Sequence, residues 1–286
     1  TRIFGTTTEE IKQAAEIIKE GGLVAFPTET VYGLGADALN AEAVGKVYAA
    51  KGRPSDNPMI VHISSKDDVI KLTPEITEDM QELMDEFWPG PLTMVVPALG
   101  IIPKVTTGGL DTVGIRMPSE PAAAELISAA ETPIAAPSAN LSGKPSPTTY
   151  QHVMDDLDGR IDGIIAGGEC KAGIESTVVD MTEETPVILR PGVITAEQLS
   201  QTLGKTVGID PALLEKPDIF NNGGLLQTDA SFKPKAPGMK YKHYAPKAEM
   251  IIFQGEPENI KLAMAEEKMK RNFFGQRVEI IVFDNE

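Results

Sequence analysis

The sequence predicts an α/β fold, in which helices alternate with the strands of one sheet. Short apolar runs typical of buried strands alternate with longer segments that have helical periodicity. The chain has 286 residues, 41% of them hydrophobic, which is enough for two domains with real cores. Two late strands, at residues 177–180 and 187–190, follow each other without a helix between them. A purely parallel sheet is therefore not expected.

The first elements follow from apolar spacing and stop signals. Thr7 and Glu10 form a capping-box pattern, and the helix that follows them stops at Gly21-Gly22. The face that we expect this helix to bury consists of Ile11, Ala14, Ala15 and Ile18. Residues 23–26 then predict a short buried strand that ends at Pro27.

The same alternation continues to about residue 203. Helices are predicted at residues 41–50, 75–87 and 119–130, after Tyr150, and near residues 195–203. Strands are predicted at residues 59–63, 92–96, 112–116, 134–136, 164–166, 177–180 and 187–190.

The composition changes near residue 215. Residues 216–247 are rich in Gly, Pro, Asn and Lys and predict a linker. Beyond it, residues 249–253, a charged helix near 257–271 and residues 278–283 predict one β-α-β unit, too little to bury a core alone. We therefore divide the chain into a first α/β domain (1–215), a linker (216–247) and a partial C-terminal α/β domain (248–286). The chain begins at Thr1 without a methionine, and we expect it to be clipped at both ends.

Charge and cysteine content restrict the class of protein. The net charge of −16, from 42 acidic and 26 basic residues, argues against a surface that binds nucleic acid over its whole extent, although a local basic cleft is compatible with it. One cysteine, Cys170, excludes a disulfide framework and a cysteine-cluster zinc site. We therefore expect a reducing, cytoplasmic location. No apolar run reaches the roughly 18 residues that a membrane-spanning helix needs.

Two short polar segments predict a binding site. Lys51-Gly52-Arg53-Pro54 provides two cations on a polar, Gly/Pro-marked loop, and Ser138-Ala139-Asn140 provides a hydroxyl and an amide that can donate hydrogen bonds. Together they would form a pocket for a polyanion such as a nucleoside triphosphate. Taken singly, each residue is better explained as part of a solvated surface.

Other ligand-binding motifs are excluded by their spacing. Gly143-Lys144 lacks the glycine that a P-loop needs five residues earlier, where Ser138 stands. Residues 33–38 match a loose dinucleotide pattern, but Pro27 to Val31 separates them from the preceding strand. The three histidines (62, 152 and 243) have no metal-ligand spacing, and no Gly-x-Ser-x-Gly elbow surrounds a serine.

Seven segments, in order along the chain, together carry a family resemblance. They are residues 23–35 (LVAFPTETVYGLG), 51–54 (KGRP), 57–62 (NPMIVH), 87–93 (FWPGPLT), 113–118 (VGIRMP), 136–140 (APSAN) and 236–246 (APGMKYKHYAP). The chain thus resembles the YrdC family, and residues 236–246 resemble the linker of its long, two-domain members. The resemblance implies a twisted mixed sheet with helices around a concave cleft, then a linker and a small, truncated Rossmann-like α/β domain.

The resemblance also implies an activity. Such proteins are threonylcarbamoyl-AMP (L-threonylcarbamoyladenylate) synthases, nucleotidyltransferases that use ATP, L-threonine and bicarbonate and release pyrophosphate. Their product supplies the machinery that makes threonylcarbamoyladenosine in tRNAs that read codons beginning with A. We expect Mg²⁺ on the ATP phosphates, and we assign it no protein ligand. Neither a membrane nor a stable nucleic-acid complex is required.

Residue roles follow from the chemistry and from the resemblance together. The catalytic group is Lys51, Arg53, Ser138 and Asn140. The ATP side is Arg53, Asn57, Thr112, Ser138, Ser146, Arg190, His243 and Tyr244. The threonine side is Thr30, His62, Arg116, Ala136 (through its backbone) and Ser176. Lys51 and Arg53 would balance phosphate charge, while Ser138 and Asn140 would donate to phosphate or carbamate oxygens. Arg116 would clamp the carboxylate of the amino acid.

Simpler roles and other functions remain open at this point. His62 could be a core histidine, and Thr112, Ser146 and Ser176 could be turn or strand caps. Trp88 is predicted to be a packing residue, and Cys170 is predicted to be inert. An RNA-binding module with a basic cleft is the main alternative function. A carbamoyl-transfer maturation enzyme is a third, but its zinc-finger segments are excluded by the single cysteine. Finally, residues 236–246 carry cations and aromatics and predict a lid over the ATP site.

Overall fold

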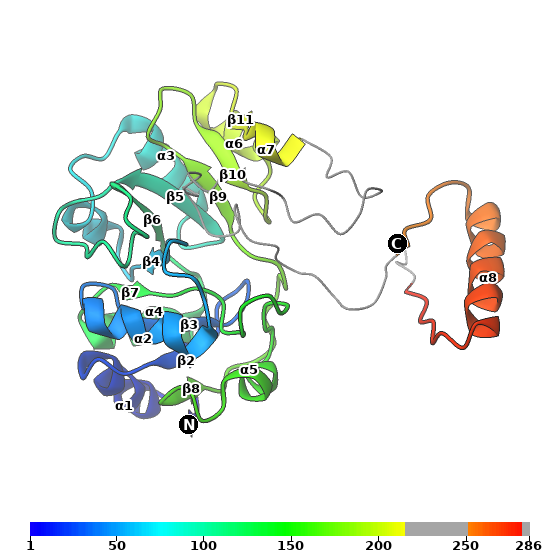
Figure 1. The fold of residues 1–286 in the computed structure, drawn as a ribbon. Coiled ribbons are helices and arrows are strands. Elements are labelled where there is room, and N and C mark those ends of the chain that lie inside the picture. The colour runs from blue at the N-terminus through cyan, green and yellow to red at the C-terminus, as the bar shows by residue number, and fades with distance from the viewer. Residues whose placement is uncertain (215–250, 282–286) are drawn as a thin grey trace. The chain divides into compact units, whose positions relative to one another are not determined.

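The computed structural model describes residues 1–214 and 251–281, which fall in two compact units (Figure 1). The described part of the first unit contains one sheet with the strand order β1-β8-β2-β3-β7-β4-β6-β5-β9-β10-β11. The strands are β1 (Arg2–Phe4), β2 (Val24–Phe26), β3 (Gly33–Asp37), β4 (Ile60–His62), β5 (Leu92–Pro97), β6 (Thr112–Arg116), β7 (Ile134–Ala135), β8 (Gly163–Ile165), β9 (Thr177–Asp180), β10 (Val187–Arg190) and β11 (Gly208–Ile209).

Seven α-helices and one 3₁₀-helix accompany these strands in the described part of the first unit. They are α1 (Thr8–Lys19), α2 (Ala41–Lys51), η1 (Lys66–Lys71), α3 (Glu78–Phe87), α4 (Pro121–Ala130), α5 (Tyr150–Leu157), α6 (Ala196–Leu203) and α7 (Pro211–Leu214). The predicted helices and strands between residues 8 and 203 are thus all present, with boundaries shifted by a few residues. The α/β prediction is confirmed.

The sheet is mixed. β9 and β10, the two consecutive late strands, pair antiparallel, whereas β5 and β9 pair parallel. β2 and β3 also pair antiparallel. The expectation that the sheet would not be purely parallel is therefore confirmed.

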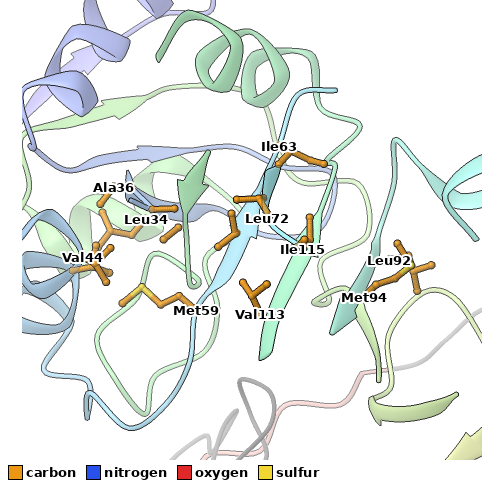
Figure 2. Packing of buried hydrophobic residues seen from close by; sticks show 14 of the residues in the cluster. Leu34, Ala36, Val44, Met59, Ile63, Leu72, Leu92, Met94, Val113 and Ile115 are labelled. Atoms are coloured by element: carbon orange, nitrogen blue, oxygen red, sulfur yellow. The ribbon is translucent and has the colours of Figure 1, made fainter. Parts of the chain in front are cut away.

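Strand alternation explains how helices cover both faces of the sheet. Val24 and Phe26 on β2 point into a cluster with α1 and α4, and this cluster contains the predicted face of α1. Leu23 and Ala25 point the other way, into a larger cluster with Val44 of α2. Successive side chains of a strand face opposite sides of a sheet, so α2 lies on the face opposite α1 and α4. Figure 2 shows part of the larger cluster, which extends along the sheet to β5.

The glycine-rich segment at residues 33–37 forms β3, a strand that the sequence analysis did not predict. It runs antiparallel to β2, so no strand-turn-helix loop for a dinucleotide exists there. Gly35 is required by packing, because a Cβ atom on it would lie 2.8 Å from both Phe26 and Ile134. The exclusion of a Rossmann nucleotide site at this position is confirmed.

The described part of the second unit is dominated by one helix, α8 (Pro257–Phe273), none of whose residues is buried. The strands predicted at 249–253 and 278–283 are not found where they fall within the described residues, at 251–253 and 278–281. A strand needs a hydrogen-bonded neighbour and an apolar layer, and α8 provides no buried face for such a layer. The predicted linker at 216–247 lies outside the described residues. No helix within residues 1–214 and 251–281 is long and apolar enough to cross a membrane.

Candidate active site

The register of the central strands brings polar residues from distant segments into one row. His62 on β4 is paired with Arg116 on β6, and Arg116 is paired with Thr93 on β5. Paired residues on adjacent strands point to the same face of a sheet. His62, Arg116 and Thr93 therefore share one face, although 54 residues separate His62 from Arg116 in sequence.

A pocket lies beside this row. It is lined by Thr28, Thr30, Val31, Gly33, Arg53, Ile60, His62, Arg116, Ala136, Pro137, Ser138, Glu175, Ser176 and Arg190. The five residues assigned to the threonine side all line it. So do three of those assigned to the ATP side: Arg53, Ser138 and Arg190. Segments spread over more than 160 residues of sequence thus meet in one cavity.

Lys51 does not line the pocket and is not on an exposed loop. It is the last residue of α2, and only 3% of its surface is exposed. Its Nζ donates hydrogen bonds to the backbone carbonyl oxygens of Ser138 and Asn140, the latter at 2.5 Å. Burial, and secondarily the charge of Arg53, lower the pKa of Lys51 to about 7. Lys51 therefore fastens the loop that carries Ser138 to the end of α2.

Arg53 is also buried, in contrast to the expected surface loop. Its Nη2 donates to the carbonyl oxygen of Pro58 at 3.0 Å and to that of Asn57 at 3.4 Å. The hydroxyl of Tyr48 donates to the same Asn57 carbonyl at 2.9 Å. These bonds shape residues 53–58 around the guanidinium, which lines the pocket.

The side chain of Asn140 is committed to its own loop. Its Nδ2 donates to the carbonyl oxygens of Leu141 (2.8 Å) and Lys144 (2.9 Å). Its Oδ1 is buried and has no hydrogen-bond partner in the described part of the chain, and the same holds for Oδ1 of Asn57. Each of these two amides thus has an unused acceptor oxygen. We expected Asn140 to act as a donor, but its Nδ2 is already bonded within its own loop.

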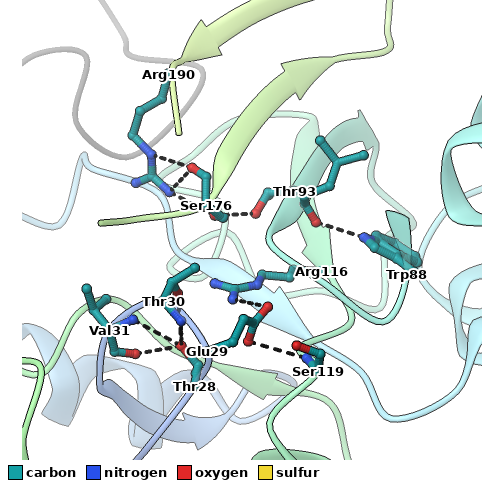
Figure 3. A network of polar contacts seen from close by, with 11 residues as sticks. Thr28, Glu29, Thr30, Val31, Trp88, Thr93, Arg116, Ser119, Ser176 and Arg190 are labelled. Carbon is teal, nitrogen blue, oxygen red and sulfur yellow. Dashed lines mark hydrogen bonds and ion pairs between the residues drawn. The ribbon is translucent and has the colours of Figure 1, made fainter. Parts of the chain in front are cut away.

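Arg116 is held by a glutamate that the sequence analysis did not single out. Its Nη2 lies 2.7 Å from Oε1 of Glu29 in an ion pair whose side chains are 5% and 11% exposed (Figure 3). Neither of these two atoms forms a hydrogen bond within the described residues, so the contact is chiefly electrostatic. The other carboxylate oxygen of Glu29 accepts from the backbone N–H of Ser119 at 3.3 Å.

Arg190 is the centre of a second network, also seen in Figure 3. Its guanidinium donates to the carbonyl and hydroxyl oxygens of Ser176, at 2.9–3.1 Å, and to Glu175 at 2.7 Å. The Ser176 hydroxyl also bonds to that of Thr93 at 2.8 Å. The other oxygen of Glu175 accepts from Ser146 at 2.9 Å. Ser146 thus does not line the pocket, but it contacts Glu175, which does.

His62 is a neutral residue in this environment. It is 3% exposed, and its burial together with the charge of Arg116 lowers its pKa to about 3. Its ring packs edge-to-face on Phe26, with 6.1 Å between ring centroids. Its Nδ1 has no hydrogen-bond partner within the described residues. A neutral imidazole can offer a ligand one donor and one acceptor.

The pocket also includes a short loop held by Thr28, another residue that the sequence analysis missed. The Thr28 hydroxyl bonds to the Thr30 hydroxyl at 2.9 Å and donates to the Val31 carbonyl at 2.6 Å. It also accepts from the backbone N–H groups of Thr30 and Val31, both at 3.2 Å. A threonine before a turn commonly makes bonds of this kind, so the residue type was the available signal.

The remaining predicted residues lie elsewhere. Thr112 begins β6, is partly exposed and does not line the pocket. His243 and Tyr244 lie outside the described residues and stay predictions. Trp88 is buried in the larger cluster, and its Nε1 donates to the Leu92 carbonyl at 2.8 Å, as expected of a packing residue. Burial raises the pKa of Cys170 to about 11, which agrees with an unreactive thiol.

Two known protein families match most of the chain. The Sua5/YciO/YrdC family, described as "Telomere recombination", matches residues 16–192. The chain belongs to this family. A second family, described as "Threonylcarbamoyl-AMP synthase, C-terminal domain", matches residues 194–285. The resemblance to the two-domain YrdC form is confirmed.

Relatives within the Sua5/YciO/YrdC family cover most of the chain. The threonylcarbamoyl-AMP synthase of Pyrococcus abyssi is 48% identical over 272 residues, which are 95% of this chain and 76% of the relative. The protein of the same name from Bacillus subtilis is 50% identical over 260 residues, or 90% of this chain and 70% of the relative. The crystal structure of P. abyssi Sua5 complexed with L-threonine matches with a TM-score of 0.88 and 46% identity, over 99% of this chain and 82% of that one.

Proposed function

We propose that the chain is a threonylcarbamoyl-AMP synthase, which converts ATP, L-threonine and bicarbonate to threonylcarbamoyl-AMP and pyrophosphate. The observation that carries the proposal is the composition of the pocket. It combines three arginines with hydroxyls and one neutral histidine. Nδ1 of this histidine has no hydrogen-bond partner in the described part of the chain, so no nucleophile-histidine-acid triad is assembled there. Such a pocket suits the positioning of anions rather than hydrolysis. The enzymes named above, to which this chain is 48–50% identical, have this activity in their names.

The reaction needs two bond-forming steps. The threonine ammonium first loses a proton, and the free amine attacks the carbon of bicarbonate, which leaves a carbamate and one water. A carbamate oxygen then attacks the α-phosphorus of ATP, and the bond from that phosphorus to the bridging oxygen breaks. The electron pair leaves with pyrophosphate. Substitution at phosphorus depends chiefly on alignment and on stabilisation of negative charge.

The threonine side would use the row on β4 and β6. Arg116 would receive the carboxylate of the amino acid, and the neutral His62 would offer a hydrogen bond without adding charge. Thr30 and Ser176 would provide hydroxyls for the threonine side chain or its amine, and the backbone of Ala136 would contribute a polar group. All five line the same pocket.

The ATP side would use Arg53, Ser138 and Arg190, which line the pocket around the place where the two substrates would meet. Arg53 and Arg190 would stabilise the negative charge on the phosphates as it redistributes. Lys51 would hold the loop of Ser138 and add charge near the phosphates. Asn57, Asn140, Thr112 and Ser146 would support this side from behind. His243 and Tyr244 remain predicted contacts of a lid.

We propose that Mg²⁺ arrives with the nucleotide, bound to the ATP phosphates. No group of three His, Cys, Asp or Glu side chains suitable for a metal ion exists among residues 1–214 and 251–281. The buried Oδ1 atoms of Asn57 and Asn140 have no donor in that part of the chain. These two amides do not line the pocket, so we assign them no direct contact with the ion, and Mg²⁺ would bind through the substrate phosphates, as it commonly does. The ion would neutralise phosphate charge, and the residues named above would orient the reactants.

The product would be used by the tRNA threonylcarbamoyl-transfer machinery, because a mixed carbamic-phosphoric anhydride is an activated donor. We expect a cytoplasmic location, where ATP and threonine are available. The RNA-binding alternative is not favoured: the relatives that cover most of the chain are named as enzymes, and the net charge is −16.

Pyrophosphate release tests the proposal. Purified protein should release pyrophosphate from ATP and Mg²⁺ only when both L-threonine and bicarbonate are present. Omission of each component in turn is the control, together with the variant Arg53→Ala. Release that is independent of threonine would contradict the proposal, and so would release that continues in bicarbonate-depleted buffer.

A further inference from the structure

Glu29 is a nearly buried carboxylate for which the proposed reaction has no assigned use. It lies in the loop between β2 and β3, and its side chain is 11% exposed. It does not line the pocket, but its ion-pair partner Arg116 does. Any effect of Glu29 on a ligand in the pocket is therefore indirect and acts through Arg116.

Glu29 is fixed at three atoms. Its backbone carbonyl accepts from the N–H of Ala172 at 2.9 Å, and its Oε2 accepts from the N–H of Ser119 at 3.3 Å. Its Oε1 lies 2.7 Å from Nη2 of Arg116. These contacts tie the carboxylate to the segment before α4 and to the end of β6. A carboxylate held in this way is a fixed anchor for the guanidinium.

The anchor leaves the rest of the guanidinium available. Nε of Arg116 is buried and donates to no acceptor in the described part of the chain. A guanidinium has five N–H donors in a rigid plane and can bind two carboxylates along different edges. With Nη2 next to Glu29, the remaining donors include the unsatisfied Nε. This atom is where an incoming carboxylate would complete the hydrogen bonds of the buried arginine.

We infer that Glu29 is a positioning residue for the amino-acid substrate: it orients Arg116 so that the free edge of the guanidinium receives the substrate carboxylate. The inference rests on the proposed function, because it takes an α-amino acid as the ligand of Arg116. A second consequence concerns charge. Loss of the carboxylate would leave a buried guanidinium uncompensated and without its fixed orientation, and simple anions would then compete with the substrate carboxylate for it.

The effect should be confined to the amino acid. The contacts of Glu29 lead to Arg116, Ser119 and Ala172, none of which we assign to ATP. Arg190 on the ATP side has its own glutamate, Glu175, at 2.7 Å. Substitution of a residue with a merely structural role would weaken the binding of both substrates and destabilise the fold. Substitution of a positioning residue of this kind would weaken the binding of threonine alone.

The test is Glu29→Gln, which keeps the shape and removes the charge. We expect the Kd for L-threonine, measured by calorimetry, and the KM for threonine to rise about 10-fold or more, within the range of coupling between contacting residues. The KM for ATP should change less than about threefold, because a substitution at an independent site has only a small effect on ATP binding. In an Arg116→Lys background, the same substitution should add little, because the guanidinium through which Glu29 acts is gone. Asp85→Asn, which removes an exposed carboxylate from its pair with Lys66, is the matched control.

The outcomes separate the two proposals. Wild-type protein that binds threonine but releases no pyrophosphate would overturn the proposed function, while the threonine Kd of the variant would still decide the role of Glu29. An unchanged threonine Kd in Glu29→Gln would overturn the inference, as would an equal loss for ATP and threonine. Circular dichroism checks the fold. If Glu29→Gln is unfolded, Glu29→Asp replaces it: this variant keeps the charge but shortens the reach, and its threonine Kd should also rise.

Discussion

Nζ of Lys51 donates a hydrogen bond to the backbone carbonyl of Asn140, 89 residues later, at 2.5 Å. A second bond from the same atom reaches the carbonyl of Ser138. The two motifs that first indicated a site are thus joined by a contact from a side chain to the backbone. The lysine fixes the shape of the loop before any ligand binds, and its charge lies beside the pocket rather than in open solvent.

Lys51→Ala should therefore impair both activity and stability. Pyrophosphate release should fall about 100-fold or more, because a charge near developing negative charge is lost. The free energy of unfolding should fall by about 1–3 kcal/mol, because two buried carbonyl oxygens lose their donor. Urea denaturation and the pyrophosphate assay measure the two effects. Lys46→Ala, on the same helix but with its side chain half exposed, is the control and should keep near-wild-type activity.

Binding of ATP should be accompanied by proton uptake. The pKa of Lys51 is lowered to about 7, so the free protein carries it mostly neutral at about pH 8. Nearby phosphates favour the ammonium form and raise this pKa, so a proton is taken from the buffer. Calorimetry in two buffers of different ionisation enthalpy measures the uptake. It should disappear in Lys51→Met, and equal uptake in the variant would show that another group is responsible.

The same lysine also affects stability at high pH. Its pKa is 10.5 in an unfolded chain and about 7 in the folded protein, so the unfolded state binds more protons between these values. Its contribution to the free energy of unfolding therefore rises with pH from about 7 to about 10.5. As the pH rises through that window, the free energy of unfolding of the wild type should increase relative to that of Lys51→Met. A difference that stays constant across it would contradict the lowered pKa.

His62 should destabilise the fold as the pH falls. Its pKa is lowered from 6.5 to about 3, so below about pH 6.5 the unfolded state takes up a proton that the folded state excludes. Wild-type protein should lose up to about 1.4 kcal/mol per pH unit more than His62→Gln between about pH 6 and 4. Denaturation curves at several pH values give the slopes. Parallel slopes would mean that His62 is protonated in the folded protein.

Amino-acid preference tests the shape of the pocket. Its lining combines the hydroxyls of Thr28, Thr30 and Ser176 with apolar groups from Val31 and Ile60. Threonine should be preferred to serine only modestly, since one methyl group contributes about 1–3 kcal/mol. 2-Aminobutyrate, which lacks the hydroxyl, should be the poorer substrate because its binding leaves buried polar groups unsatisfied. Equal kcat/KM values for all three would rule out a dedicated threonine pocket.

Local sequence signals predicted the elements well where one face of an element is buried. The four apolar residues of α1 are all buried, as their spacing predicts. β3 was missed, because Gly33 and Gly35 lack the branched side chains typical of strands and are required by close packing instead. The three-residue β1 gives too short a pattern to detect.

The sequence motifs identified many of the residues at the site. They did not predict which residues of different motifs would contact each other. Arg116 was identified, but its partner Glu29 lies 87 residues earlier, in the loop between β2 and β3, and only the tertiary fold brings the two side chains together. Lys51 was placed on a surface loop, since no local signal shows that a charged residue at a helix end is buried. Such pairings depend on strand order, which the sequence pattern does not determine.

The central claim is that one product joins all three reactants. Protein incubated with ATP, Mg²⁺, L-threonine and isotopically labelled bicarbonate should yield a nucleotide that contains AMP, threonine and the labelled carbon, detected by mass spectrometry. The label should be absent when unlabelled bicarbonate is used, and the nucleotide should not form without threonine. A product that contains AMP and threonine but no carbon from bicarbonate would contradict the account, because the enzyme would then activate the amino acid directly.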